Sequence, residues 1–100
     1  MNIRFVGIIV RPDSPQAEEK GRELAQWLNQ QGIATAEQNK IDPAMDLLIV
    51  LGGDGSLLHI ADSASQHGLP VVGVNMGHLG FLSEIAVDEM FQALAMVLAG

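Results

Sequence analysis

The 100-residue chain contains no cysteine and no tyrosine, and its aromatic residues are one tryptophan and three phenylalanines. Without cysteine there can be no disulfide framework, no thiolate zinc site and no cysteine nucleophile, so a reducing cytoplasm is the expected compartment. No basic stretch followed by an apolar block opens the chain, which argues against secretion. The apolar runs, such as Leu47–Leu51, have the length of strands and are too short to span a membrane.

Positive charge is missing from the second part of the chain. Residues 41–100 hold no lysine or arginine but seven acidic residues, whereas five bases and five acids balance in residues 1–40. The net charge of −7 therefore arises entirely after residue 40. Such a surface repels phosphate backbones, so we do not expect this chain to bind nucleic acid.

Hydrophobic residues make up 48% of the chain, enough for one core, and strand-like and helix-like segments alternate. This order predicts an α/β fold, a doubly wound parallel sheet in which residues 1–100 form one domain. Leu47–Leu51 is apolar on both faces and should lie in the middle of the sheet. The expected strands cover residues 3–10, 33–36, 47–51 and 71–74, and the expected helices cover residues 15–31, 56–67 and the segment after Asp88.

The first helix carries clear start and stop signals. Ser14 is a candidate N-cap, Pro15 suits the first helical position, and Gly32 can end the helix in a left-handed conformation. A stripe at helical spacing should face the sheet; it consists of Ala17, Gly21, Leu24, Ala25 and Leu28.

In doubly wound sheets, ligands bind beyond the carboxyl ends of the strands, where the strand order reverses. The segment Gly52-Gly53-Asp54-Gly55-Ser56 joins the expected central strand to a helix. Its glycines let a ligand approach the backbone, and the start of the helix offers free amide hydrogens, so Gly53, Gly55 and Ser56 are candidate phosphate contacts. The loop is neither a Walker motif nor the dinucleotide fingerprint, since no lysine follows and Leu58 stands where a third glycine is required.

Asp54 is unusual in such a loop because a carboxylate beside a phosphate is unfavourable without a cation or a proton to accept. Three roles remain open: a magnesium contact, a hydrogen bond to a ribose hydroxyl, and general base on that hydroxyl. The structural alternative is a plain Asp-Gly turn.

A second glycine-rich segment, residues 73–82, should converge on the same crevice. Asn75 offers an amide, Gly77 permits close approach, and Phe81 could form an apolar wall against a base or could instead be a core residue. The three histidines, His59, His67 and His78, do not form a metal set, and His59 and His67 are expected at the surface.

Residues 50–58 and 70–84 together resemble the NAD kinase family, and the opening strand and helix extend this resemblance over essentially the whole chain. The resemblance implies transfer of the γ-phosphoryl group of ATP, or of polyphosphate, to the 2′-hydroxyl of the adenosine ribose of NAD, giving NADP. It implies that Asp54 is the essential aspartate that acts as base or contacts the metal. It also implies that Gly55, Leu58 and Phe81 line the NAD site, that Mg²⁺ takes part, and that the protein forms a homodimer or homotetramer.

The same resemblance makes this chain the amino-terminal domain of a longer enzyme, because family members have a second, β-rich domain that supplies further substrate-binding residues. Without that domain, and without any lysine or arginine after residue 40, we expect the isolated chain to be inactive. Two alternatives remain: a lipid or sugar kinase with the same Gly-Gly-Asp-Gly turn, and a non-catalytic nucleotide-binding module.

Overall fold

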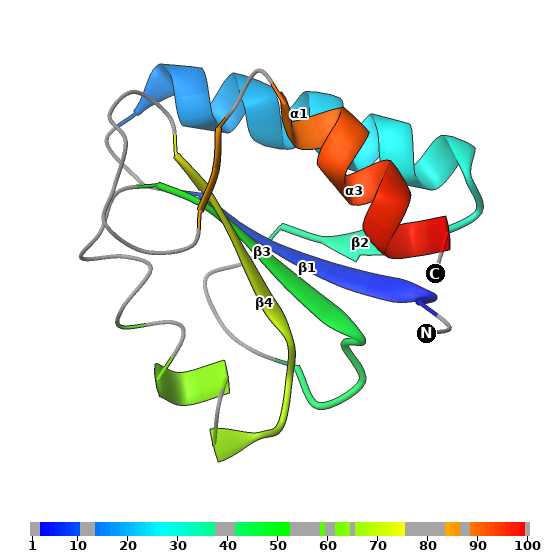
Figure 1. Cartoon of the computed structure of the whole chain (residues 1–100), viewed down its shortest axis with the longest axis vertical. Coiled ribbons are helices and arrows are strands. Elements are labelled where there is room, and N and C mark those ends of the chain that lie inside the picture. The colour runs from blue at the N-terminus through cyan, green and yellow to red at the C-terminus, as the bar shows by residue number, and fades with distance from the viewer. Residues whose placement is uncertain are drawn as a thin grey trace.

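A computed structural model describes residues 3–10, 14–37, 42–52, 59, 62–64, 66–75, 84–86 and 89–99. Within these residues, five strands form one sheet, and helices cover both of its faces (Figure 1). The strands are β1 (Phe5–Val10), β2 (Ala34–Ala36), β3 (Leu47–Leu51), β4 (Val71–Asn75) and β5 (Glu84–Ala86); the labelled helices are α1 (Pro15–Gln30) and α3 (Met90–Ala99).

The sheet has the strand order β2-β1-β3-β4-β5, and every neighbouring pair is parallel. The chain runs from β1 outward to β2, then returns to the other side of β1 and continues through β3 to β5. The direction of winding therefore reverses between β1 and β3, as in a flavodoxin-like sheet. The predicted doubly wound parallel fold is confirmed.

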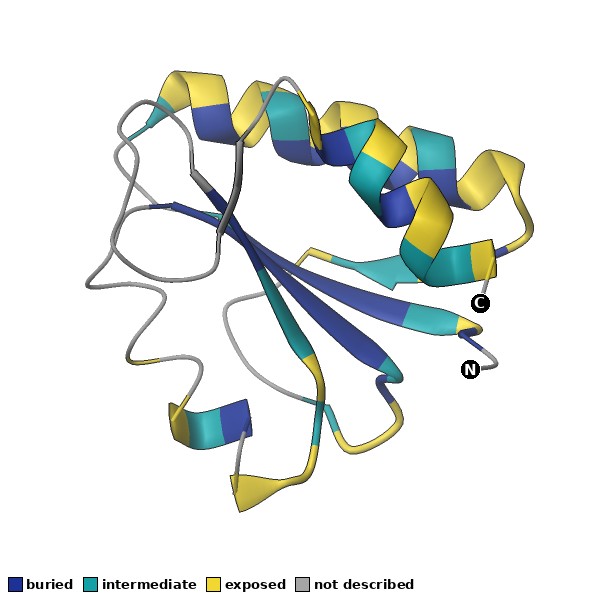
Figure 2. Cartoon of the chain, in the orientation of Figure 1, coloured by how far each residue is buried: buried dark blue, intermediate teal, exposed yellow. Residues whose placement is uncertain are grey.

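β3 occupies the centre of the sheet because all five of its residues are apolar and can be covered on both faces. Its side chains alternate between two hydrophobic clusters, one on each side of the sheet (Figure 2). Leu47, Ile49 and Leu51 face α1 and α3, whereas Leu48 and Val50 face the opposite side with Ala64. Each cluster is thus built from strands that are distant in sequence.

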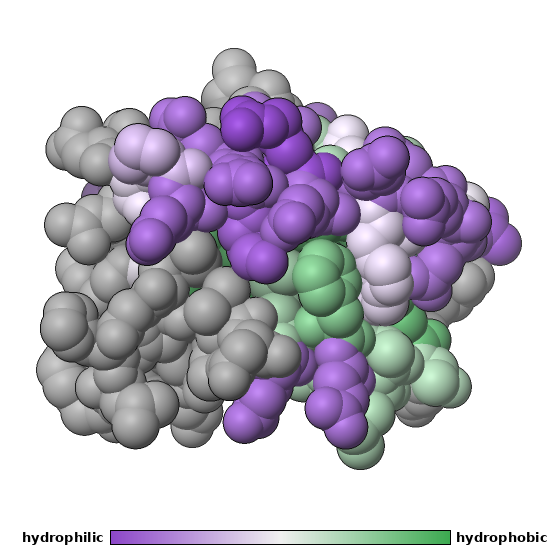
Figure 3. All heavy atoms as spheres, turned by 90° about the horizontal axis from the view of Figure 1, so that it is seen from above, coloured by the Kyte–Doolittle hydropathy of each residue, from purple (hydrophilic) through white to green (hydrophobic). Residues whose placement is uncertain are grey.

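Helix α1 forms as its start and stop signals predict. The Ser14 hydroxyl accepts a hydrogen bond from the Ala17 amide at 3.1 Å, and Gly32 adopts a φ of 79° after the helix. All five predicted inward residues are buried, and α1 lays them on β1, β2 and β3. Its outer face is hydrophilic when the molecule is viewed from above (Figure 3).

Helix α3 packs beside α1 on the same face of the sheet (Figure 1). Its Phe91 ring meets the Trp27 ring of α1 edge to face, with centroids 5.3 Å apart, and the Lys20 ammonium lies 5.9 Å from the Phe91 centroid. Met90 and Leu94 are buried, while Met96 is 74% exposed. The predicted last helix is therefore present, but its apolar character extends onto its outer surface.

Two predictions about the elements need correction or lie outside the described residues. Strand β5 was not predicted, because three residues with a charged first member carry too little periodicity to indicate a strand. Residues 59, 62–64 and 66 are helical, in agreement with the expected helix over residues 56–67, but residues 56–58 lie outside the described part. The proposed cap Asp88 also lies outside it.

Gly21 lets α1 approach the end of β1 closely. A Cβ at this position would lie 2.9 Å from Cγ2 of Val10 and 3.5 Å from Cδ1 of Leu51. Val10 is β-branched and has few rotamers with which to move aside. The spacing between α1 and the sheet therefore depends on the missing side chain of Gly21.

We expect Gly21→Leu to lower the free energy of unfolding by about 1 to 3 kcal/mol, because the added side chain must displace Val10 or lift α1 from the sheet. Urea denaturation followed by circular dichroism measures the change. Gln26→Leu adds the same side chain to an exposed position of α1 and serves as the control. Equal denaturation midpoints for the two variants would contradict this explanation.

Candidate functional site

The carboxyl ends of the three central strands lie at one edge of the sheet. In the parallel register, Val10 of β1 is paired with Leu51 of β3, and Leu51 is paired with Val74 of β4. The amide of Gly52 donates a hydrogen bond to the carbonyl oxygen of Val74 at 3.3 Å, so the pairing continues one residue past β3. The chain leaves all three strands at this carboxyl edge.

Gly52 opens the first glycine-rich loop and is buried between β1 and β4. It follows the central strand at the point where the winding reverses, between β1 and β3. In doubly wound sheets, this reversal leaves a crevice above the strand ends because the two flanking connections pass to opposite faces. The described structure therefore starts the Gly-Gly-Asp-Gly loop where a ligand site is expected.

Most predicted site residues follow these strand ends directly. Asn75 is the last residue of β4, which brings its backbone to the carboxyl edge, and its side chain lies outside the described part of the structure. The other predicted contacts also lie outside the described residues; they are Gly53, Asp54, Gly55, Ser56, Leu58, Gly77 and Phe81.

The histidines that the structure describes are surface residues, as predicted. His59 and His67 are both exposed, and Nδ1 of His67 is 2.9 Å from the carbonyl oxygen of Ser63, one helical turn earlier. This bond makes Nδ1 the protonated ring nitrogen, because a carbonyl oxygen can only accept. His78 lies outside the described residues.

One carboxylate at the carboxyl edge was not among the predicted site residues. Glu37 follows β2 directly, and its Oε1 lies 3.8 Å from the position that a Cβ on Gly21 would take. The same position is next to Val10, the last residue of β1. No short motif surrounds Glu37; the available signal was its place immediately after a predicted strand.

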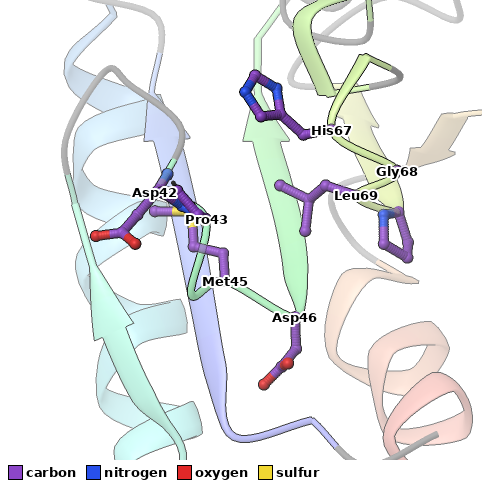
Figure 4. A pocket seen from close by; sticks show the side chains of 8 residues that line it. Asp42, Pro43, Met45, Asp46, His67, Gly68 and Leu69 are labelled. Carbon is purple, nitrogen blue, oxygen red and sulfur yellow. Dashed lines mark hydrogen bonds between the residues drawn. The ribbon is translucent and has the colours of Figure 1, made fainter.

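A pocket of about 300 Å³ opens at the opposite, amino edge of the sheet (Figure 4). The turns that precede β3 and β4 line it, including Asp42, Asp46, His67 and Leu69. It is separated from the strand ends described above by the length of the strands. Pocket size alone would therefore direct attention to the wrong edge.

The polar groups of this pocket hold the fold together. One carboxylate oxygen of Asp46 accepts hydrogen bonds from the amides of Arg4 and Phe5, at 2.9 and 3.1 Å. Asp42 accepts one from the amide of Ala44 at 2.8 Å. These bonds fix the start of β1 and the turn into β3, which accounts for the two acids without a ligand.

Among the described residues, no three histidine or acidic side chains are grouped in a way that could hold a metal ion. A search of the same residues found no helix with the length and apolar character needed to cross a membrane.

The sequence profile of the ATP-NAD kinase N-terminal domain matches residues 34–100. This match covers more than half of the chain and includes both glycine-rich segments. The chain belongs to the NAD kinase family. The resemblance drawn from the two motifs is thereby confirmed.

Two curated NAD kinases illustrate the relationship. The chain is 43% identical to the NAD kinase of Heliobacterium modesticaldum, an alignment that covers 95% of this chain and 39% of the relative. It is 40% identical to the NAD kinase of Thiobacillus denitrificans, over 100% of this chain and 41% of the relative. The chain thus spans about two fifths of the length of these enzymes.

The fold is also that of a solved family member. A crystal structure of yeast NADH kinase complexed with NADH superposes with a TM-score of 0.76, covering 98% of this chain and 36% of the yeast chain, at 21% identity. This similarity supports the α/β architecture.

If the carboxyl edge is the ligand site, millimolar NAD added to the isotope-labelled chain should shift the amide resonances of Val10, Gly52 and Asn75. The amides of Met45 and His67 at the amino edge should move much less, because the strands separate the two edges. Nuclear magnetic resonance titration measures both groups in one experiment. Larger shifts at Met45 and His67 would place the ligand in the pocket of Figure 4 instead.

Proposed function

We propose that a protein containing this chain is an NAD kinase, which transfers the γ-phosphoryl group of ATP, or of polyphosphate, to the 2′-hydroxyl of the adenosine ribose of NAD to give NADP. Membership of the family supports this activity. The observation that carries it is the position of Gly52, buried at the end of the central strand where the winding reverses. Asp54 stands two residues further along the same loop.

In this proposal, the loop after β3 and the loop after β4 share the NAD molecule. Amide hydrogens of Gly53, Gly55 and Ser56 bind phosphate oxygens, since glycine leaves the backbone open to the ligand. Leu58 and Phe81 provide apolar contacts to the dinucleotide, and Asn75 with Gly77 completes the second loop. Each loop follows a strand end at the carboxyl edge.

Asp54 is the proposed catalytic residue. Its carboxylate accepts the proton of the ribose 2′-hydroxyl as that oxygen attacks the γ-phosphorus, and the bond from the γ-phosphorus to the bridging oxygen of the donor breaks. The remaining ADP, or the shortened polyphosphate, is the leaving group. An aspartate in a loop otherwise suited to phosphate is explained by this need for a base.

Magnesium is the proposed companion of the phosphoryl donor. Mg²⁺ is commonly bound by one or two carboxylates together with substrate phosphates, so a loop with the single carboxylate of Asp54 fits this ion. When bound, it neutralises charge on the transferring phosphoryl group. This contribution matters here because residues 41–100 contain no lysine or arginine.

We further propose that the chain acts as the amino-terminal domain of a cytoplasmic enzyme that forms a homodimer or homotetramer. The matched relatives are more than twice as long as this chain. Cationic groups and further substrate contacts are expected from the remaining part of such enzymes, because phosphoryl transfer relies on positive charge around the migrating group.

Asp54→Asn should abolish NADP formation while the fold is retained. The variant is made in a chimaera in which residues 1–100 replace the matching part of the Heliobacterium modesticaldum enzyme. Coupled measurement of NADP gives the rate, and circular dichroism with thermal melting reports the fold. Loss of a general base typically costs about 10² to 10⁴ in rate. A rate equal to that of the unsubstituted chimaera would remove Asp54 from the mechanism.

The isolated 100-residue chain should form no NADP from NAD and ATP or polyphosphate, whereas the chimaera should form it. The physical reason is the shortage of positive charge and of substrate contacts in the chain itself. Both proteins are assayed at equal concentration with Mg²⁺ present. Turnover by the isolated chain at the chimaera's rate would show that residues 1–100 suffice.

A further inference from the structure

Glu37 lies where the two sides of the carboxyl edge differ. Ala36, the last residue of β2, is paired with Gly7 of β1 and packs on the face opposite α1. Because side chains alternate along an extended chain, Glu37 points to the α1 face. The short distance from its Oε1 to the Gly21 position confirms this direction. The carboxylate is exposed and lies beside the end of β1 (Figure 1 shows β2, β1 and α1).

Within the described residues, no hydrogen bond or ion pair involves the Glu37 carboxylate. The one described ion pair on α1 joins Lys20 to Glu23, at 2.7 Å, on the helix surface. Glu37 is also not required by the core, since its side chain is exposed. Its oxygens are therefore free of described protein partners at the edge where ligands of this fold class bind.

A carboxylate after the second strand has a known chemical use in doubly wound sheets. When a nucleotide places its phosphates near the reversal of winding, an acid at this position accepts hydrogen bonds from ribose hydroxyls. A carboxylate is an acceptor only, so it suits hydroxyl donors and repels phosphate. The ligand group beside Glu37 is therefore expected to be a ribose with its phosphates directed toward β3.

The topology indicates which nucleotide this is, given the proposed function. The proposed NAD contacts follow β3 and β4, on one side of the reversal between β1 and β3. The ends of β1 and β2 lie on the other side, and Glu37 with Gly21 belongs to that side. The transferring group must lie between the two substrates, so the second substrate occupies the β1 and β2 side.

We propose that Glu37 accepts hydrogen bonds from the ribose hydroxyls of ATP and is a specificity-determining residue for the phosphoryl donor. This assignment rests on the proposed kinase activity. Polyphosphate has no ribose and gains nothing from Glu37; its negative charge is instead repelled. The residue thus favours a nucleoside triphosphate over an inorganic donor.

The first test measures binding to the 100-residue chain without catalysis. Resonance shifts of the labelled chain give dissociation constants for ATP, 2′,3′-dideoxy-ATP and tripolyphosphate. Loss of a hydrogen bond to a charged group weakens binding roughly tenfold or more, so the dideoxy compound should bind wild type that much more weakly than ATP. Glu37→Ala should bind ATP and dideoxy-ATP equally, with tripolyphosphate binding unchanged or tighter.

Glu23→Ala is the matched control, because it removes the same charge from the solvent face of α1 and should leave all three constants unchanged. The proposal is overturned if wild type does not distinguish ATP from dideoxy-ATP or binds neither at millimolar concentration. It is also overturned if Glu37→Ala weakens ATP and tripolyphosphate equally, which would indicate a structural effect.

The second test uses the chimaera and separates this proposal from the proposed function. Glu37→Ala should raise the KM for ATP roughly tenfold, while the KM for NAD and the rate with polyphosphate stay the same. An unchanged KM for ATP overturns the assignment of Glu37 while the kinase activity stands. Absence of NADP formation by the unsubstituted chimaera, with the ribose dependence of ATP binding intact, counts against the proposed function alone.

Discussion

The parallel pairing of β1, β3 and β4 is the constraint on which the rest of this structure depends. It places Val10, Leu51 and Val74 side by side, so that segments far apart in sequence leave the sheet at one edge. The pairing is stable because β3 is apolar on both faces and is covered from both sides. A polar residue in β3 would be buried without a hydrogen-bonding partner and would weaken both clusters together.

The two edges of the sheet divide the work of the acidic residues. At the amino edge, Asp42 and Asp46 accept hydrogen bonds from backbone amides and fix the turns around β1 and β3. At the carboxyl edge, Glu37 has no described protein partner, and the loop that begins at Gly52 leads to Asp54. Acids bonded to the backbone serve the fold, whereas acids left open at strand ends are available to a ligand.

Close packing between α1 and the sheet connects the core to the candidate site. The missing side chain of Gly21 brings the helix against Val10, and the same gap leaves room for the Glu37 carboxylate. The aromatic contact between Trp27 and Phe91 then holds α3 beside α1. Changes in this layer are therefore expected to reach the strand ends, because well-packed interiors transmit small displacements.

Local patterns in the sequence were sufficient for α1, for the central position of β3 and for the edge at which the glycine-rich loops begin. These features depend on neighbouring residues: the Ser14 cap, the helical spacing of Leu24 and Leu28, and the glycine after Leu51. The short strand β5 and the position of Glu37 could not be obtained in this way.

By itself, then, the sequence determined which segments are helices and strands, the parallel α/β class and the family, since periodicity, capping and motifs are contained in contiguous residues. Only the tertiary structure decided the strand order, the contact of Gly21 with Val10, and the meeting of Glu37 with the end of β1. Those features follow from hydrogen bonding and burial between segments distant in the chain, which no local pattern specifies.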